Sequence, residues 1–456
     1  DSAARELHAR PAPSAVLLRN GDMFDSERGE MRPRTSVLLR GDRTWRPPRV
    51  VVRERTQTAS ALAVVPAFER RLGTRLWLLR QLRFQEDEER GVLEAVQELE
   101  LADDGWHLPR NGRWAGRDDL DRLPLEEADR DLVAGYLDGL EDVPPARAAW
   151  SRPGWRGELL EWVEAELARL GRRLVALEQA KVWGISTVVR IETNRGELWF
   201  KASAPLPLFV NEAVVTERLA ARFPGHVPAP VAVEPDRGWI LFEPFDVLGW
   251  HAAPAVRREL FGRFARLQRR TVELVDGLLA DGCLDRRLDV LERQVDDLLG
   301  DRRALHRLDA AELRAVRRLA PKLRETIRRL DALGLPPTLV HGDLHPGNVA
   351  RSDGELAYFD WTDACVAHPF VDLHSLQWER DQATREGVLD AYLAPWREVV
   401  PEETLREAVA LAAVATPLHH AVSYATITAS LEPASKPELD AAHNFLREAV
   451  ARVREL

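Results

Sequence analysis

One stretch, VHGDLHPGNVARSDGELAYFDWTD at positions 340–363, constrains the fold of this chain more than any other part of the sequence. Asp343 and Asn348 lie five residues apart on a loop that a Pro-Gly pair tightens. Asp360 ends the apolar run LAYFD, which follows the turn signal Asp353-Gly354. Because a tight turn brings the ends of two short strands together, the sequence predicts that Asp343, Asn348 and Asp360 converge on one point.

These three residue types suit a magnesium-bound nucleotide phosphate. Mg²⁺ prefers hard oxygen ligands and keeps several waters, so one carboxylate, one amide oxygen and the substrate phosphates are sufficient to bind it. Asp360 and Asn348 fit that role. Asp343 is then free to orient an attacking hydroxyl and accept its proton, since phosphoryl transfer depends on positioning more than on covalent chemistry.

Length and composition limit the class of protein. A chain of 456 residues is too long for one ordinary core, so two or three domains are expected. The content of 45% hydrophobic and 30% charged residues is globular, and the net charge of −10 argues against a nucleic-acid-binding protein. The sequence contains no long apolar run and no signal-peptide pattern, which predicts a cytoplasmic protein without a membrane partner. Cys283 and Cys365 have no metal-type spacing and are predicted to be small buried residues.

Residues 1–145 are predicted to form a separate mixed α/β domain. Runs such as TSVLLR, ALAVVPAF and RLWLLRQLRF predict strands, and residues 86–100 and 125–140 predict helices. The strand order and the segment GRWAGRDDLDRLPLEEADRDLVAGYL resemble a Nudix-type hydrolase domain. The segment RGVLEAVQELEL departs from the magnesium-binding helix of that family. The domain is therefore expected to be catalytically silent and to serve as an interaction or regulatory unit for a protein partner.

Residues 146–180 are predicted to be a linker with an amphipathic helix at 158–179. From residue 181 the pattern changes to two strands joined by the hairpin signal Asn194-Arg195-Gly196, then a helix at 208–223 and two further strands. This predicts a small α+β lobe over residues 181–246. Residues 247–456 are mostly helical in pattern.

The central stretch resembles the small-molecule branch of the protein-kinase-like fold, the aminoglycoside phosphotransferase and choline kinase-like family. Protein kinases carry H-R-D-x-x-x-x-N followed by a metal-binding Asp, and this branch carries HGDxxxxN followed by DW and P-x-x-D-L. The sequence has HGDLHPGN at 341–348, DW at 360–361 and PFVDL at 369–373. Over residues 181–456 the resemblance implies a bilobal α+β fold. Residues 181–246 would be its β-rich N-lobe, and 247–456 its helical C-lobe with the catalytic loop 341–348.

The resemblance also implies roles for the residues of the motif. Asp343 would be the catalytic base, and Asn348 and Asp360 the magnesium ligands. His345 would be an auxiliary polar group near the phosphates. His341 is expected to be a buried brace of the loop, and Asp372 a brace or helix cap.

The N-lobe is expected to supply the nucleotide contacts. Lys201 matches the strand lysine that holds the α- and β-phosphates, and Glu212 matches the helix glutamate that pairs with it, with Glu217 as the alternative. A GxGxxG loop is lacking, so Gly184 and the Ser186 hydroxyl would replace it.

Residues 242–245, including Glu243 and Phe245, would form the hinge against which adenine binds. His419, His420 and Ser423, on a late helix, are candidates for the border of an acceptor pocket.

The resulting prediction is an ATP- or GTP-dependent phosphotransferase that uses Mg²⁺ to move the γ-phosphate to a hydroxyl of a small molecule, such as a sugar, an aminoglycoside or an amino alcohol. Only eight residues separate Asp360 from Pro369, which leaves no room for the segment on which a protein substrate docks. One alternative is a nucleotide-binding scaffold, or regulatory pseudokinase, acting through the N-terminal domain. A third reading, Nudix-type hydrolysis by residues 1–150, conflicts with the incomplete motif.

Overall fold

The computed structural model describes residues 13–19, 24–25, 30–31, 36–40, 44–51, 61–87, 92–102, 106–140, 143–352 and 354–456. The chain divides into two compact units. Unit 1 extends to Ala204 and includes the later segment Leu431–Glu438, and unit 2 consists of Pro205–Ser430 and Leu439–Leu456. The domain boundaries at 145, 180 and 246 stay a prediction.

The first sheet of unit 1 has the strand order β5-β4-β1-β8-β7, with β6 paired to β1 and β9 paired to β4. β8 is central, because it pairs in parallel with β1 and antiparallel with β7. The elements of this region are β1 (Pro13–Arg19), β2 (Phe24–Asp25), β3 (Glu30–Met31), β4 (Ser36–Arg40), β5 (Trp45–Arg46), β6 (Arg49–Val51), α1 (Ala61–Leu72), β7 (Leu76–Asp87), β8 (Val92–Leu101), β9 (Gly112–Ala115) and α2 (Glu127–Asp138).

Two sequence predictions in this region are wrong, whereas the strands expected from TSVLLR and RLWLLRQLRF are confirmed as β4 and β7. The helix expected at 86–100 is strand β8, whose buried Glu98 and Glu100 have partners distant in the sequence. The strand expected at 61–68 is helix α1, whose buried residues recur at the three- and four-residue spacing of a helix. The helix expected at 125–140 is confirmed as α2.

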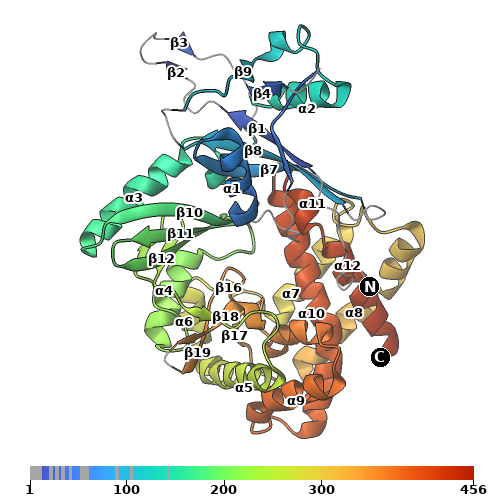
Figure 1. Cartoon of the computed structure of the whole chain (residues 1–456). Coiled ribbons are helices and arrows are strands. Elements are labelled where there is room, and N and C mark those ends of the chain that lie inside the picture. Colours follow the sequence, from blue (N-terminus) through green and yellow to red (C-terminus); the bar gives the residue numbers. More distant parts are fainter. Residues whose placement is uncertain are drawn as a thin grey trace. The chain divides into compact units, whose positions relative to one another are not determined.

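Unit 1 continues with α3 (Trp155–Arg169) and an antiparallel meander of β10 (Leu174–Val182), β11 (Ser186–Thr193) and β12 (Gly196–Ser203). Figure 1 shows these three strands next to one another, with α3 beside them. The helix expected at 158–179 is confirmed only as far as Arg169. Gly171 has φ +66°, a left-handed conformation that ends a helix and favours glycine, and the chain then becomes β10.

Aromatic side chains join the first sheet of unit 1 to the meander. The Phe200 ring of β12 lies 6.0 Å from the Trp155 ring and 5.9 Å from the Trp162 ring, and Trp155 lies 6.5 Å from Trp77 of β7. The Gln179 side chain of β10 also accepts from the Leu78 amide at 2.7 Å and donates to its carbonyl at 2.8 Å. Residues before 145 and the meander therefore share one core.

Unit 2 is mainly helical. Its helix α10 packs against α8 and α12 (Figure 1), and α5 packs against α9. The helices of this part of the chain are α4 (Glu212–Arg222), α5 (Pro254–Thr271), α6 (Val275–Ala280), α7 (Leu288–Gly300), α8 (Ala310–Ala332), α9 (Gln382–Leu393), α10 (Glu402–Ser430) and α12 (Ala442–Glu455). The short helix α11 (Lys436–Leu439) belongs, except for its last residue, to the later segment of unit 1.

Short strands complete unit 2. β13 (Ala232–Glu234) and β14 (Trp239–Phe242) form a hairpin. β15 (Asp246–Val247) pairs with β18 (Val349–Ser352), which pairs with β19 (Glu355–Tyr358). β20 (Cys365–Ala367) lies between β16 (Leu284–Asp285) and β17 (Thr338–Val340). Sheets and helices are both present in quantity, so the α+β class is confirmed.

Burial within unit 2 explains two features of its composition. Within the described residues, α10 is the one helix long and apolar enough to cross a membrane, and 72% of its most apolar window is buried inside the protein. Cys283 and Cys365 are both buried and free, as predicted. Burial raises the pKa of the Cys283 thiol to about 12, so it is a packing residue and not a nucleophile.

Candidate active site

The catalytic loop starts where β17 ends, and one buried carboxylate holds it in place. Asp372, in the 3-10 helix η5 (Pro369–Trp378), accepts from the His341 amide at 3.0 Å and the Gly342 amide at 2.9 Å. Gln268 of α5 donates to the same carboxylate at 2.9 Å. These bonds confirm Asp372 as a brace. Burial raises its pKa to about 7.

Gly342 and His341 are both required by close packing. Gly342 has φ +84°, and a Cβ there would lie 2.6 Å from the Cβ of Asp363, so no larger residue fits. The His341 ring is fully buried against Trp361 and its Nε2 lies 2.9 Å from the Phe359 carbonyl. Burial lowers the pKa of His341, so the ring is a neutral brace, as the sequence predicted.

The hairpin register brings the two predicted magnesium ligands together. Val349 of β18 pairs with Tyr358 of β19, and the Phe359 amide donates to the Asn348 carbonyl at 3.0 Å. Asp360 follows directly, with φ +65°, a conformation that is uncommon for a residue other than glycine. This left-handed residue redirects the chain just after the strand ends.

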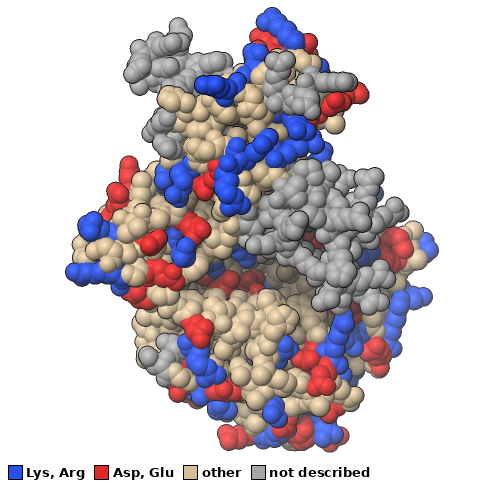
Figure 2. All heavy atoms as spheres, viewed as in Figure 1, with Lys and Arg blue, Asp and Glu red and all other residues tan. Residues whose placement is uncertain are grey.

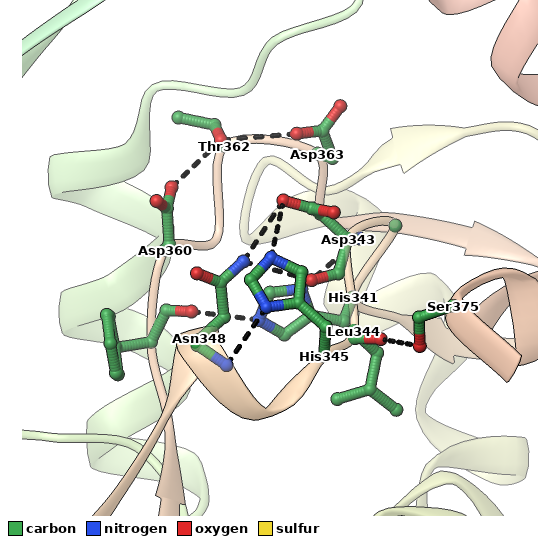
Figure 3. A network of polar contacts seen from close by, with 12 residues as sticks. His341, Asp343, Leu344, His345, Asn348, Asp360, Thr362, Asp363 and Ser375 are labelled. Carbon is green, nitrogen blue, oxygen red and sulfur yellow. Dashed lines mark hydrogen bonds and ion pairs between the residues drawn. The ribbon is translucent and has the colours of Figure 1, made fainter. Parts of the chain in front are cut away.

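Asp343, His345 and Asn348 contact one another (Figure 3). The Asn348 side-chain amide donates to the Asp343 carboxylate at 3.1 Å and to its carbonyl at 3.0 Å, so its side-chain oxygen turns away from Asp343. His345 Nε2 lies 3.4 Å from Asp343 Oδ2. Its Nδ1 accepts from the Gly347 amide at 3.0 Å, which leaves the ring proton on the nitrogen that faces Asp343.

The Asp343 carboxylate is ionised and accessible. Desolvation by burial raises its pKa, but the interaction with His345, chiefly its hydrogen bond, opposes that effect, and the pKa is lowered overall. The side chain keeps 51% of its surface exposed. A ligand hydroxyl can therefore reach a carboxylate that two neighbours already orient.

A second acidic pair lies on the turn after β19 (Figure 3). The Thr362 hydroxyl lies 3.2 Å from Asp360 and 3.2 Å from Asp363, so it bridges the two carboxylates. Burial, together with the negative charges of Asp343 and Asp360, raises the pKa of Asp363 to about 7. A cation bound nearby would relieve this concentration of negative charge.

The side chains present fit a magnesium ion. The Asn348 oxygen is left available by its amide nitrogen's bond to Asp343, and Asp360 adds a carboxylate. No cluster of three or more His, Cys, Asp or Glu side chains in the described ranges could hold a metal by itself. Two protein ligands suit Mg²⁺, which takes its remaining ligands from water and phosphate.

In unit 1, the predicted nucleotide residues lie on the meander. Lys201 of β12 faces the side of the sheet opposite Phe200, because side chains alternate along a strand. Val188 is its partner across the register with β11. The Ser186 hydroxyl is buried and accepts from Trp183 Nε1 at 2.5 Å, and Lys181 Nζ lies 3.8 Å from the Trp183 ring centre.

In unit 2, Glu212 is the first residue of α4 and is buried, whereas Glu217 is exposed. Glu243 is exposed after β14. The Phe245 ring packs 4.8 Å from the Phe359 ring, directly before Asp360. The predicted hinge segment thus contacts the strand that ends at the candidate metal ligand.

Two exposed tryptophans beside the catalytic loop were not predicted as site residues. The Trp250 indole stacks on the His345 ring at 3.9 Å, and Trp378 lies 6.3 Å from Trp250. They are 54% and 51% exposed, and no other tryptophan of the described part is exposed. Gly347 permits the stack, since a Cβ there would lie 2.9 Å from the His345 ring. Nothing in the sequence signals this arrangement, because the residues meet only through the fold.

His419 and Ser423, on helix α10, both contact the side chain of a buried arginine. Arg286 Nη1 lies 3.0 Å from His419 Nε2 and 2.5 Å from Ser423 Oγ. Burial lowers the pKa of Arg286 to about 10, still well above neutrality. The His420 ring lies 3.9 Å from the His374 ring, tilted by 38°, and burial lowers the pKa values of His419 and His420 well below their usual range. These imidazoles are therefore neutral.

The sequence model of the phosphotransferase enzyme family matches residues 183–407, a range that contains Lys201, the catalytic loop and Asp360. This region of the chain belongs to the phosphotransferase enzyme family. The predicted family and the predicted enzyme class, a small-molecule phosphotransferase, are thereby confirmed. The match begins at residue 183 and gives no support to the Nudix-like resemblance of residues 1–145.

Solved structures similar to this phosphotransferase include three bacterial proteins. The macrolide 2'-phosphotransferase of Brachybacterium faecium is 22% identical, with 63% of this chain and 98% of that chain covered and a TM-score of 0.44. The choline kinase of Streptococcus pneumoniae is 14% identical, with 66% and 100% covered and a TM-score of 0.46. A choline/ethanolamine kinase family protein of Mesorhizobium loti is 19% identical, with 65% and 100% covered and a TM-score of 0.41. A comparison with curated protein sequences finds no match.

Proposed function

We propose that this phosphotransferase moves the γ-phosphate of ATP or GTP to a hydroxyl of a small molecule, with Asp343 as the catalytic base. The observation that carries the proposal is the accessible Asp343 carboxylate, which accepts from Asn348 and lies beside the His345 ring proton. The acceptor hydroxyl gives its proton to Asp343 and its oxygen bonds to the γ-phosphorus. The bond from that phosphorus to the β–γ bridging oxygen breaks, and the nucleoside diphosphate leaves with the electron pair. The low pKa of Asp343 suits it to orient the hydroxyl and take the proton late.

Asn348 and Asp360 are the proposed magnesium ligands. When bound, the ion neutralises phosphate charge during transfer. Gly184, Ser186, Lys201 and Glu212 are assigned to the phosphates, and Glu243 and Phe245 to the base. The buried position of Glu212 favours it over the exposed Glu217 as the partner of the lysine.

The surroundings of Asp343 also favour a class of acceptor. Trp250 and Trp378 offer exposed indole faces next to the base, and the nearby His374 is neutral because burial lowers its pKa to about 4. Indole faces bind the apolar faces of rings. The indole pair therefore suits an acceptor with a sugar ring, or another ring that carries a hydroxyl, and its faces would also attract the cation of an amino alcohol.

The remaining partner predictions are compatible with this function. Around α5 and α9, at the bottom of Figure 2, acidic and basic side chains are interspersed, and that face offers no continuous basic surface for a nucleic acid. The cytoplasmic location stays a prediction. It agrees with the use of a nucleoside triphosphate as donor.

The test is nucleoside diphosphate release with ATP and with GTP, with and without Mg²⁺, against a panel of sugars, macrolides, aminoglycosides and amino alcohols. Mass spectrometry of the acceptor should show the gain of one phosphate. Asp343→Ala should abolish both signals. Turnover that survives this substitution would exclude Asp343 as the base.

A further inference from the structure

The predicted nucleotide loop, residues 183–186, is held by residues from outside the family match. Trp150 is 2% exposed and its Nε1 donates to the Trp183 carbonyl at 2.9 Å. On the other side, a Cβ added to Gly184 would lie 2.6 Å from the Ser435 Cβ and 2.9 Å from its hydroxyl. The loop is thus fixed by the chain before the family region and by the chain after it.

Ser435 belongs to the segment Leu431–Glu438, which a buried ion cluster attaches to the N-terminal sheet. The Glu432 carboxylate accepts from Arg80 of β7 at 2.9 Å and from Arg147 at 3.1 Å. Side-chain exposure is only 5% for Glu432, 10% for Arg80 and 4% for Arg147. The Ser435 amide donates to the Glu432 carbonyl at 3.0 Å. The ion cluster that holds Glu432 therefore also helps to fix the position of Ser435.

The cluster extends further into the N-terminal sheet. Arg80 also binds Glu98 of β8 at 2.6 Å, and the Tyr136 hydroxyl of α2 lies 3.2 Å from Glu98. Buried ion pairs are costly to desolvate and strongly destabilising when one partner is removed. Their position is consequently set closely by the surrounding sheet, and so is the position of the segment that they hold.

We propose that the N-terminal sheet is a built-in support of the nucleotide loop, with Trp150, Arg147 and Glu432 as positioning residues for nucleotide binding. This proposal rests on the assignment of residues 183–186 to the nucleotide phosphates. A glycine-rich loop can bring its backbone N–H groups close to a phosphate because glycine has no Cβ, whereas a loop with a single glycine depends more on its surroundings for that position. The Trp150 bond and the Ser435 contact supply the missing restraint from outside.

The first test separates nucleotide binding from catalysis. In the full-length chain, Trp150→Phe and Glu432→Gln should raise KM for ATP about fivefold or more, while kcat and KM for the acceptor change less than twofold. The matched control is Trp106→Phe, because Trp106 Nε1 also donates to a backbone carbonyl, that of Leu72 at the end of α1, at 3.0 Å. Equal effects of Trp150→Phe and Trp106→Phe on KM for ATP would overturn the proposal.

The second test is rescue. Gly184→Ala should raise KM for ATP, because the new Cβ collides with Ser435. Adding Ser435→Gly removes both colliding atoms and should restore KM to within twofold of the wild type. A Gly184→Ala defect that Ser435→Gly leaves unchanged would show that Ser435 does not set the loop.

The third measurement needs no nucleotide. Amide hydrogen exchange of the peptide containing residues 183–186 should become faster in Trp150→Phe and Glu432→Gln than in the wild type or Trp106→Phe. Unchanged exchange would overturn the support role. If the wild type binds neither ATP nor GTP with Mg²⁺ by titration calorimetry, the proposed function fails, and the exchange result still decides whether these residues hold the loop.

Discussion

The Asp343 carboxylate contacts both Asn348 and His345. Substitution of Asp343 can separate nucleotide binding from phosphoryl transfer. Asn348 donates to its carboxylate, and His345 lowers its pKa. Asp343→Asn keeps the size of the side chain and removes its ability to accept a proton. We expect kcat to fall about 10²- to 10⁴-fold, with KM for the nucleotide within twofold of the wild-type value, measured by steady-state kinetics.

The control for Asp343→Asn is Asp289→Asn, on α7, where the carboxylate is 63% exposed and bound to Arg293. Its kcat should equal that of the wild type. A fall in kcat of less than tenfold for Asp343→Asn would contradict the assigned role.

Asp360 has a positive φ of +65°, which has a consequence for stability as well as for metal binding. An L-residue in this conformation is destabilised by about 1–2 kcal/mol relative to glycine. Asp360→Gly should therefore be more stable than Asp360→Ala by about 1 kcal/mol, while both lose Mg²⁺-dependent turnover. Urea unfolding followed by circular dichroism measures the difference, and equal stability of the two variants would contradict a strained conformation.

At the scale of residues, the sequence was sufficient to predict the part of the site that a single short segment of the chain forms. The spacing of Asp343, Asn348 and Asp360 is enforced by one loop and one hairpin, so the pattern was sufficient to bring them together. Trp250 and Trp378 could not be found in the same way. Their positions depend on packing between distant segments, because Trp250 precedes its stacking partner His345 by 95 residues and its neighbour Trp378 by 128 residues.

At the scale of elements, the 3-10 helix η5 is capped at its N-terminal end by a histidine side chain, which can be protonated. His368 Nδ1 accepts from the Phe370 amide at 3.2 Å, and burial lowers its pKa to about 3. The unfolded chain has a histidine pKa of about 6.5. Between pH 6.5 and 3 the unfolded state binds one more proton, so the free energy of unfolding falls as the pH is lowered, by about 1.4 kcal/mol per pH unit from this residue.

His368→Asn isolates this contribution. Asparagine is a good N-cap and can accept from the same amide without titrating. We expect the slope of the free energy of unfolding against pH, between pH 4 and 6, to decrease by about 1 kcal/mol per unit. Urea titrations at several pH values measure it. An unchanged slope would mean that His368 is already protonated in the folded protein.

The prediction of a helix at 86–100 is wrong because the burial of its glutamates depends on partners that are distant in the sequence. The segment VLEAVQELEL has glutamates that a solvent-exposed helix would carry, yet in β8 both Glu98 and Glu100 are buried. Glu98 is paired with Arg80, and Glu100 accepts from the Gly154 amide at 3.1 Å. A central strand covered on both faces loses the alternation that identifies strands, and no local pattern reports such partners.

At the scale of the whole molecule, Trp155 joins the N-terminal sheet to the meander, since it contacts both Trp77 and Phe200. It is 3% exposed. Trp155→Ala should therefore lower the free energy of unfolding of unit 1 by about 3–5 kcal/mol. Trp378→Ala, at a side chain that is 51% exposed, should change it by less than about 0.5 kcal/mol.

Denaturant unfolding with near-ultraviolet circular dichroism measures both variants. Two separate transitions, one for residues 1–145 and one for the meander, would contradict a shared core. A single transition that shifts in Trp155→Ala would agree with it.

The segment Leu431–Glu438 also bears on how the chain matures. Unit 1 combines residues up to Ala204 with the later segment Leu431–Glu438, so it lacks Glu432 until translation has passed that residue. During synthesis, Arg80 and Arg147 emerge early and have no counter-ion from this segment. Release of a chain truncated before residue 431 should therefore yield a protein that chaperones retain, even though every residue of its catalytic loop has been translated.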